Sequence, residues 1–262
     1  MQRTIPALVL LGTLALAACN EDDTTGAPAE TVPDIAVSDL GTTSWPPANA
    51  LRAAVDVGGA TDPLADNVMV VLDMSGSMAR SGCSGQAPNR AEAAKGALLD
   101  WISANPADNT GLVSFSAKGL ETDLGLGQGT AHAEALVERI RTLQADGGTP
   151  LRSAMDLAAA ELERQAAAQG GTGTYRLIVV TDGQANSGED PRPLVRAIAA
   201  NPANMIEIHT IGFCIDGGHA LNDPQRVFYT DATSPEELRA GLDATLGEAA
   251  DFDLTEFEEI TP

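Results

Sequence analysis

The stretch DMSGS, residues 73–77, carries one carboxylate and two hydroxyls at alternate positions: Asp73, Ser75 and Ser77. It follows the apolar run VMVVL, which is typical of a strand covered on both faces. A strand that ends by presenting these oxygens from a glycine-containing turn could supply an enzyme nucleophile, a phosphate cradle or a metal site. The rest of the chain has to distinguish these three kinds of chemistry.

Two further segments place oxygen-bearing side chains at comparable points. DGGTP (146–150) brings Thr149 to the start of a predicted helix, and VVTDG (179–183) ends a second apolar run with Asp182. Because the carboxyl ends of parallel strands share one edge of a sheet, we expect these side chains to converge with those of residues 73–77. Two carboxylates and three hydroxyls form an oxygen-only set, which suits a hard divalent cation, above all Mg²⁺.

The elements that must position these residues alternate between strand and helix. Such alternation predicts an α/β domain with a mainly parallel sheet and helices on both faces. The predicted strands are 67–73, 110–117, 120–126, 175–182, 204–213 and 226–230, and the predicted helices are 90–104, 131–143, 149–168, 193–200 and 234–249.

The three motifs together resemble the metal-ion-dependent adhesion site of the von Willebrand factor type A (vWA) domain, over roughly residues 66–249. The resemblance implies a doubly wound, Rossmann-like sheet of six strands in the order 3-2-1-4-5-6, with the third strand antiparallel. It also implies that Ser75 and Ser77 bind the ion directly and that Thr149 binds it directly or through water. Asp73 and Asp182 would act largely through water or hydrogen bonds.

This ligand set predicts how such an ion would behave. Neutral hydroxyls compensate little of its charge, so Mg²⁺, or Mn²⁺ or Ca²⁺ in its place, would remain electrophilic and would take an Asp or Glu carboxylate from a protein partner. We therefore expect an adhesion or assembly scaffold, with no small-molecule substrate and no enzymatic activity. The alternative is an accessory subunit of an ATPase-linked assembly or chaperone system, as related domains are in chelatases and MoxR-type systems. The cytosolic location of those ATPases disfavours it here.

Enzymatic alternatives lack necessary groups. A phosphoaspartate phosphatase of the haloacid-dehalogenase kind would need a second aspartate where Ser75 stands, and neither of the two lysines, Lys95 and Lys118, is convincingly placed to stabilise a phosphoryl group. A P-loop motif is absent from the sequence.

Serine hydrolysis would require a positioned histidine. His132 starts a predicted helix, His209 is expected in the core, and His219 is expected to be a solvated loop residue that alone could approach the site. Asp73 and Ser75 are expected on a solvent-facing rim, where substitution would remove little core packing.

The amino-terminal residues predict export. Residues 1–18 form a candidate signal segment, and the sequence LAAC at 16–19 resembles a bacterial lipobox, which implies acylation of Cys19. Residues 19–65 would then form a lipidated, flexible tether to a membrane of the bacterial cell envelope, at the periplasmic face or the cell surface. An ordinary cleaved signal peptide and an uncleaved anchor are the alternatives.

The other two cysteines, Cys83 and Cys214, follow predicted strands on the site-bearing edge. An even pair in an oxidising compartment favours a disulfide. Two free thiols, or a zinc site completed by His219, are the other possibilities.

The net charge of the chain also limits the classes of partner that it could bind. A net charge of −22 argues against nucleic acid, because phosphate binding requires clustered Lys and Arg. The end of the chain, residues 250–262, is expected to be a solvated acidic tail. Alternatively Glu256, Glu258 or Glu259 could fill the metal site of a neighbouring copy.

Overall fold

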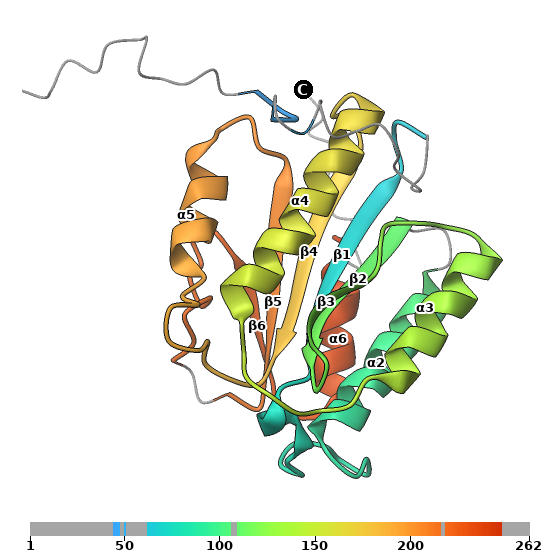
Figure 1. The fold of residues 1–262 in the computed structure, drawn as a ribbon, viewed down its shortest axis with the longest axis vertical. Helices are drawn as coiled ribbons and strands as arrows, with labels where there is room; N and C mark the ends of the chain where they lie inside the picture. The colour runs from blue at the N-terminus through green and yellow to red at the C-terminus, as the bar shows by residue number, and fades with distance from the viewer. Residues whose placement is uncertain (1–43, 48–49, 51–61, 106–108, 216–217, 248–262) are drawn as a thin grey trace, which may run out of the picture. The chain divides into compact units, whose positions relative to one another are not determined.

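The computed structural model describes residues 44–47, 50, 62–105, 109–215 and 218–247. Its centre is a six-stranded sheet in the order β3-β2-β1-β4-β5-β6, in which β3 alone is antiparallel to its neighbour. The strands are β1 (Asp66–Asp73), β2 (Asn109–Ser116), β3 (Gly119–Leu124), β4 (Thr174–Thr181), β5 (Ile206–Phe213) and β6 (Phe228–Ala232). The order and the antiparallel third strand confirm the predicted fold (Figure 1).

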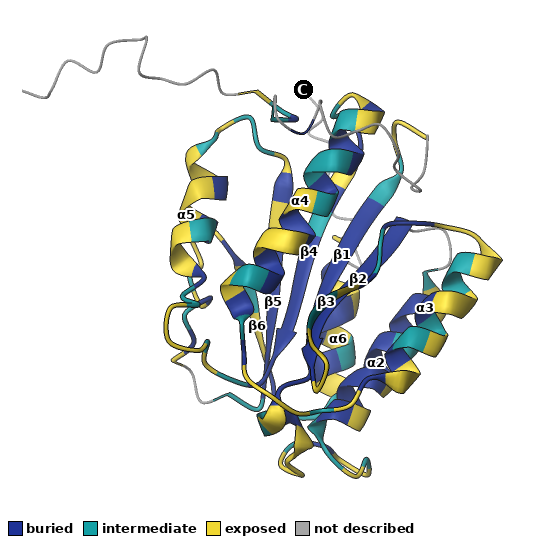
Figure 2. Ribbon diagram, in the orientation of Figure 1, coloured by how far each residue is buried: buried dark blue, intermediate teal, exposed yellow. Residues whose placement is uncertain are grey.

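Helices cover both faces of this sheet. Helices α2 (Arg90–Ala104), α3 (Thr130–Thr142) and α6 (Pro235–Ala244) pack against one face, and α4 (Leu151–Gln169) and α5 (Arg192–Ala200) against the other. Strand β1 therefore has two buried faces, which explains its continuous apolar run: Val70 contributes to one core cluster and Val71 to the other. Figure 2 shows the central strands as almost uniformly buried.

Capping side chains mark the starts of helices α2 and α6. The side chain of Asn89 accepts a hydrogen bond from the Glu92 amide at 2.9 Å, so α2 starts at Arg90, as predicted. Ser234 caps α6 in the same way, accepting from the Glu237 amide at 3.1 Å. Helix α6 ends at Ala244, five residues before the predicted end.

The two ends of the sheet carry different features. At the carboxyl end of β1, the chain turns through a short 3-10 helix, η1 (Gly76–Ala79). At the amino end of β4, Trp45 packs edge-on against Tyr175 with ring centroids 5.2 Å apart. Trp45 belongs to the range predicted as tether, so at least this part of that range contacts the domain.

The candidate signal segment, Cys19 and the acidic tail lie outside the described residues. In the described part of the chain, no helix combines the length and apolar character that crossing a bilayer requires.

Two glycine-to-alanine changes test the packing of this fold. A Cβ at Gly111, on β2, would clash with the Met69 sulfur and lie 3.1 Å from the Leu124 carbonyl oxygen, whereas a Cβ at Gly96, on α2, meets nothing within 4 Å. We expect Gly111→Ala to lower the free energy of unfolding by about 1–3 kcal/mol. Gly96→Ala should raise it by up to about 1 kcal/mol. Urea unfolding measures both, and equal effects would contradict this account of the packing.

Candidate metal centre

Asp73 ends β1 with both carboxylate oxygens engaged. Its Oδ1 accepts from the Ser75 amide at 2.8 Å and its Oδ2 accepts from the Thr181 hydroxyl at 2.6 Å. The residue is fully buried and Ser75 is only 2% exposed, so the expectation that both lie on a solvent-facing rim is wrong. The reason is local: the turn after β1 folds over the strand end and is covered by the loop before α4, with Gly76 N–H donating to the Gly147 carbonyl at 3.0 Å.

Burial has a direct electrostatic consequence for this carboxyl. Loss of hydration raises the pKa of Asp73 from 3.8 to about 6, and its hydrogen bonds from Ser75 and Thr181 oppose this rise only in part. The nearby Asp182 charge adds a smaller contribution in the raising direction. A positive charge placed in this site would favour the ionised form of Asp73.

Ser75, Ser77 and Asp182 form a chain of oxygen atoms across the crevice between β1 and β4. The Ser75 and Ser77 hydroxyl oxygens are 3.0 Å apart, and the Ser77 hydroxyl donates to Asp182 Oδ1 at 2.5 Å. Adjacent ligands in an octahedral Mg²⁺ shell, with bonds of about 2.0–2.1 Å, are about 2.9 Å apart. The spacing and the donor chemistry of these oxygens therefore fit a hard divalent cation.

Thr149 lies just before α4 and is held there by two hydrogen bonds to Asn186. Its amide donates to Asn186 Oδ1 at 3.0 Å, and its carbonyl accepts from the Asn186 amide at 2.9 Å, which ties the start of α4 to the loop after β4. Asp146 N–H donates to the Met74 carbonyl at 2.9 Å and ties the same loop to the end of β1. The structure thus brings the loops of all five predicted residues together, and side-chain contacts between them join Ser75, Ser77 and Asp182.

Three contributors were missed at the sequence level. Thr181 anchors Asp73, and its position directly before Asp182 at a strand end was a usable signal. Asn186 holds Thr149 from the other side. Arg90 donates from Nη1 to Asp182 Oδ2 at 2.7 Å, and no local pattern could reveal this contact, because 92 residues separate the partners.

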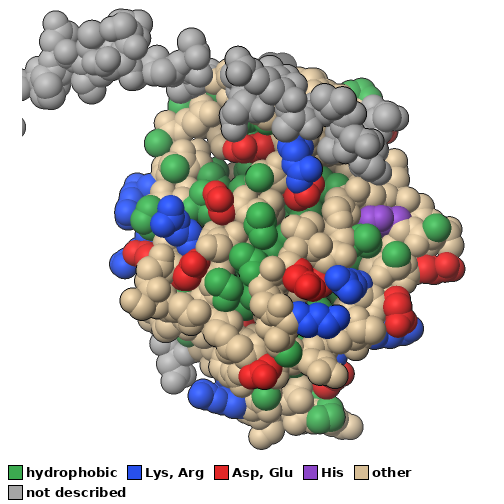
Figure 3. Space-filling view, in the orientation of Figure 1, with side chains coloured by type: hydrophobic (Ala, Val, Ile, Leu, Met, Phe, Trp, Pro, Cys, Tyr) green, Lys and Arg blue, Asp and Glu red, His purple; other side chains and the backbone are tan. Residues whose placement is uncertain are grey.

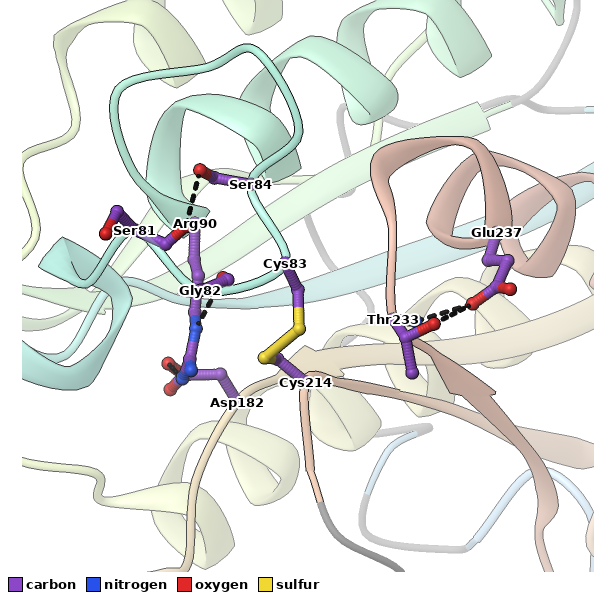
Figure 4. The surroundings of a disulfide bond; sticks show 9 residues. All are labelled: Ser81, Gly82, Cys83, Ser84, Arg90, Asp182, Cys214, Thr233 and Glu237. Carbon is purple, nitrogen blue, oxygen red and sulfur yellow. Dashed lines mark hydrogen bonds and ion pairs between the residues drawn. A yellow bond between two sulfur atoms is a disulfide. The ribbon is translucent and has the colours of Figure 1, made fainter.

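Cys83 and Cys214, for which a disulfide, free thiols and a zinc site were the alternatives, lie at the same edge of the sheet. Cys83 and Cys214 form a disulfide with their Cα atoms 5.8 Å apart, which excludes the free-thiol and zinc interpretations for this structure (Figure 4). His219 is 5% exposed rather than solvated, so that expectation is also wrong. Its Nε2 donates to the Gly183 carbonyl at 2.9 Å and its Nδ1 accepts from the Leu221 amide at 3.2 Å.

The other two histidines lie as predicted. His132 is in the first turn of α3, and His209 is packed within β5 with its ring stacked on Phe228 at 4.8 Å. Burial lowers the pKa of both His209 and His219, so both favour the neutral form.

Within the described residues, no cluster of three or more His, Cys, Asp and Glu side chains could hold a metal ion. The candidate centre contains only two such residues, Asp73 and Asp182, so a cation here would depend on hydroxyl ligands as well.

The face of the domain that carries α4 and α5 is mixed in charge. Basic and acidic side chains are interspersed on the face seen in Figure 3, and basic ones gather over the edge formed by α5. A groove of about 610 Å³ runs from the loop after β4 to this edge, lined by Gln184, Arg192, Arg196 and Arg226 among others. Arg192 and Arg226 are paired with Asp190 and Asp223, each at 2.8 Å.

The fold and the site together define a doubly wound α/β domain with an oxygen-lined crevice at the carboxyl ends of β1 and β4. Residues 68–184 match the family model described as von Willebrand factor type A domain. Residues 68–184 are therefore similar to a vWA domain, and the strand order of the sheet agrees with that fold. A comparison with curated proteins found no match.

Solved structures share this fold at low sequence identity. The SpRpn10 VWA domain is 18% identical with a TM-score of 0.52, over 69% of this chain and 95% of that one. The pilus adhesin SpaC from Lactobacillus rhamnosus GG is 18% identical with a TM-score of 0.51, over 69% and 30%. The von Willebrand factor type A protein from Catenulispora acidiphila is 19% identical with a TM-score of 0.52, over 70% and 42%. The match thus spans less than half of the latter two.

Asp73→Asn tests how much free energy of unfolding is lost by burying the ionised Asp73 carboxylate. Because burial favours its protonated form, the folded wild type binds more protons than the unfolded chain between about pH 4 and pH 6, and stability falls as pH rises through that window. Asparagine cannot ionise, yet it can accept from the Ser75 amide and donate to Thr181. In excess chelator at pH 7.5, Asp73→Asn should raise the free energy of unfolding by up to about 3 kcal/mol.

Urea unfolding at pH 7.5 and pH 4 measures this difference, which should disappear at the lower pH. Asp100→Asn, which changes an exposed carboxylate on α2, is the matched control. An equal gain for Asp73→Asn at both pH values would contradict the electrostatic explanation.

Proposed function

We propose that this protein is a metal-dependent protein-binding vWA lipoprotein of the bacterial cell envelope, acting in adhesion or as an assembly scaffold. The observation that carries the proposal is the convergence of Ser75, Ser77 and Asp182, whose oxygens lie 2.5–3.0 Å apart although the two loops are more than 100 residues apart in sequence. An oxygen set of this kind is suited to Mg²⁺, with Mn²⁺ and Ca²⁺ as alternatives.

Each residue has a part in holding the ion. Ser75, Ser77 and Thr149 would supply neutral hydroxyls, while Asp73 and Asp182 would supply the compensating negative charge. The bound ion would provide a positive potential and a position for a carboxylate from an Asp or Glu side chain of the partner. On a chain with a net charge of −22, this local positive potential would let an acidic partner approach.

Other features agree with binding rather than turnover. Serine chemistry needs a histidine with a free ring nitrogen, and both ring nitrogens of His219, the one histidine expected to approach the site, are bound to the backbone. A pilus adhesin uses the same fold, which is compatible with a role at the cell surface. The lipobox-like residues 16–19 support attachment to a membrane through Cys19.

Partner capture tests the metal-dependent function. Immobilised protein in Mg²⁺ should retain an envelope protein that a chelator elutes, and Ser75→Ala should reduce capture at least about 10-fold because a direct ligand is lost. Ser81→Ala, the same change at an exposed residue four positions beyond Ser77, should leave capture unchanged.

Blocking the carboxyl groups of the extract by amide coupling should also abolish capture, because the partner would lose its metal-binding group. Capture that survives chelation, or that is equal for Ser75→Ala and Ser81→Ala, would refute the proposed function.

Acylation is tested separately. In a bacterial host that processes lipoproteins, the wild-type chain should incorporate labelled palmitate and sediment with membranes, because Cys19 would carry the lipid. Cys19→Ser should abolish both properties, while Cys83→Ser should retain the label. Labelled Cys19→Ser protein would contradict the lipid anchor without bearing on the metal site.

A further inference from the structure

Arg90 places a fixed positive charge inside the candidate metal centre. Its Nη1 donates to Asp182 Oδ2 at 2.7 Å and its Nε donates to the Gly82 carbonyl at 3.0 Å. The Arg90 side chain is 12% exposed and that of Asp182 is fully buried. The guanidinium is therefore held between the loop after β1 and the carboxylate after β4, as Figure 4 shows.

The disulfide lies directly against this arrangement. A Cβ built on Gly82 would lie 3.1 Å from Arg90 Nη2 and 3.6 Å from the Cys214 sulfur, so Gly82 occupies the space between the guanidinium and the disulfide. Cys83 and Cys214 both have φ of 61°, a left-handed conformation that residues with a Cβ rarely adopt. The covalent link opposes relaxation of the two backbones, and it thereby keeps the Gly82 carbonyl within reach of Arg90.

We propose that Arg90 is an internal cation that competes with a divalent ion for Asp182, and that the Cys83–Cys214 disulfide holds it in place. Reduction of this disulfide by a dithiol, which is itself oxidised to a disulfide, would therefore raise the affinity of the site for divalent ions. The inference rests on the proposed function, because it deepens the role of the same site. It assigns Arg90 as a positioning residue and the disulfide as a means of regulation.

The direction of the effect follows from charge. The guanidinium neutralises one of the two carboxylates that a cation needs, and its own charge repels a divalent ion a few ångströms away. Arg90 also orients Asp182, which would favour binding of a divalent ion. The free energy gained by fixing one side chain is, however, smaller than the free energy lost when a positive charge neutralises a buried carboxylate. Loss of Arg90, or release of its loop, should therefore strengthen divalent binding.

Binding of Mn²⁺ alone, followed by the electron paramagnetic resonance of the free ion, tests this on the purified full chain. Arg90→Gln should lower the Kd for Mn²⁺ at least about 10-fold. Arg80→Gln removes the same charge from an exposed residue of the same loop and should leave the Kd within about threefold of wild type. Arg90→Lys keeps the charge and should also remain close to wild type.

The link to the disulfide needs two further variants. Cys83→Ser combined with Cys214→Ser opens the bridge without a reductant that would itself bind Mn²⁺, and it should lower the Kd in the wild-type background but not in Arg90→Gln. Gly82→Ala keeps the bridge and pushes on the guanidinium, so it should act in the same direction and likewise depend on Arg90. Circular dichroism establishes which variants are folded, and Gly82→Ala carries the test of the loop if the serine pair is not.

The outcomes separate this inference from the function on which it rests. If wild type binds Mn²⁺ and Arg90→Gln binds equally or more weakly, the internal-cation role is wrong while the metal site stands. If Arg90→Gln binds more tightly but the disulfide and Gly82 variants act independently of Arg90, the redox coupling is wrong. If no folded variant binds Mn²⁺, both the inference and the proposed function are refuted.

Discussion

The hydrogen bond from the Ser77 hydroxyl to the Asp182 carboxylate joins the ends of two adjacent strands, and the candidate centre exists only where those ends meet. The two residues are 105 positions apart, so the contact depends on the pairing of β1 with β4, in which Leu72 lies opposite Val180. Both strands are buried on both faces, so a shift of one residue would exchange the side chains that pack in the two core clusters. A slip of one residue between β1 and β4 would separate Asp73 from the Thr181 hydroxyl.

Two carboxylates in one buried crevice require compensation, and each has its own. Asp73 is satisfied by a backbone amide and the Thr181 hydroxyl, which are neutral donors, and its pKa rises as a result of burial. Asp182 is satisfied by the Ser77 hydroxyl and by the Arg90 guanidinium, which is a full charge. The site thus contains one carboxyl group that is costly to ionise, Asp73, and one carboxylate that already has a counter-ion, Asp182. Such an arrangement is expected where local stability is given up for function.

Much of the fold was predictable from the sequence, and the parts that were not depend on loops. Continuous apolar runs identified β1 and β4, Asn89 and Ser234 marked the starts of α2 and α6, and the resemblance to vWA domains gave the strand order. The exposure of Asp73 was mispredicted because strand periodicity does not reveal that the following turn covers the strand end.

The burial of His219 and the contact of Arg90 with Asp182 were missed for a related reason. Both follow from loops that return to the site from distant parts of the chain. The disulfide remained one of three alternatives until the loops were placed.

The attachment of Trp45 at the amino end of β4 has a mechanical consequence. Tension applied between that end and the crevice would run along the strand axes, so the ladder of β1 and β4 would resist it in shear. Many hydrogen bonds would then be loaded at once rather than one after another.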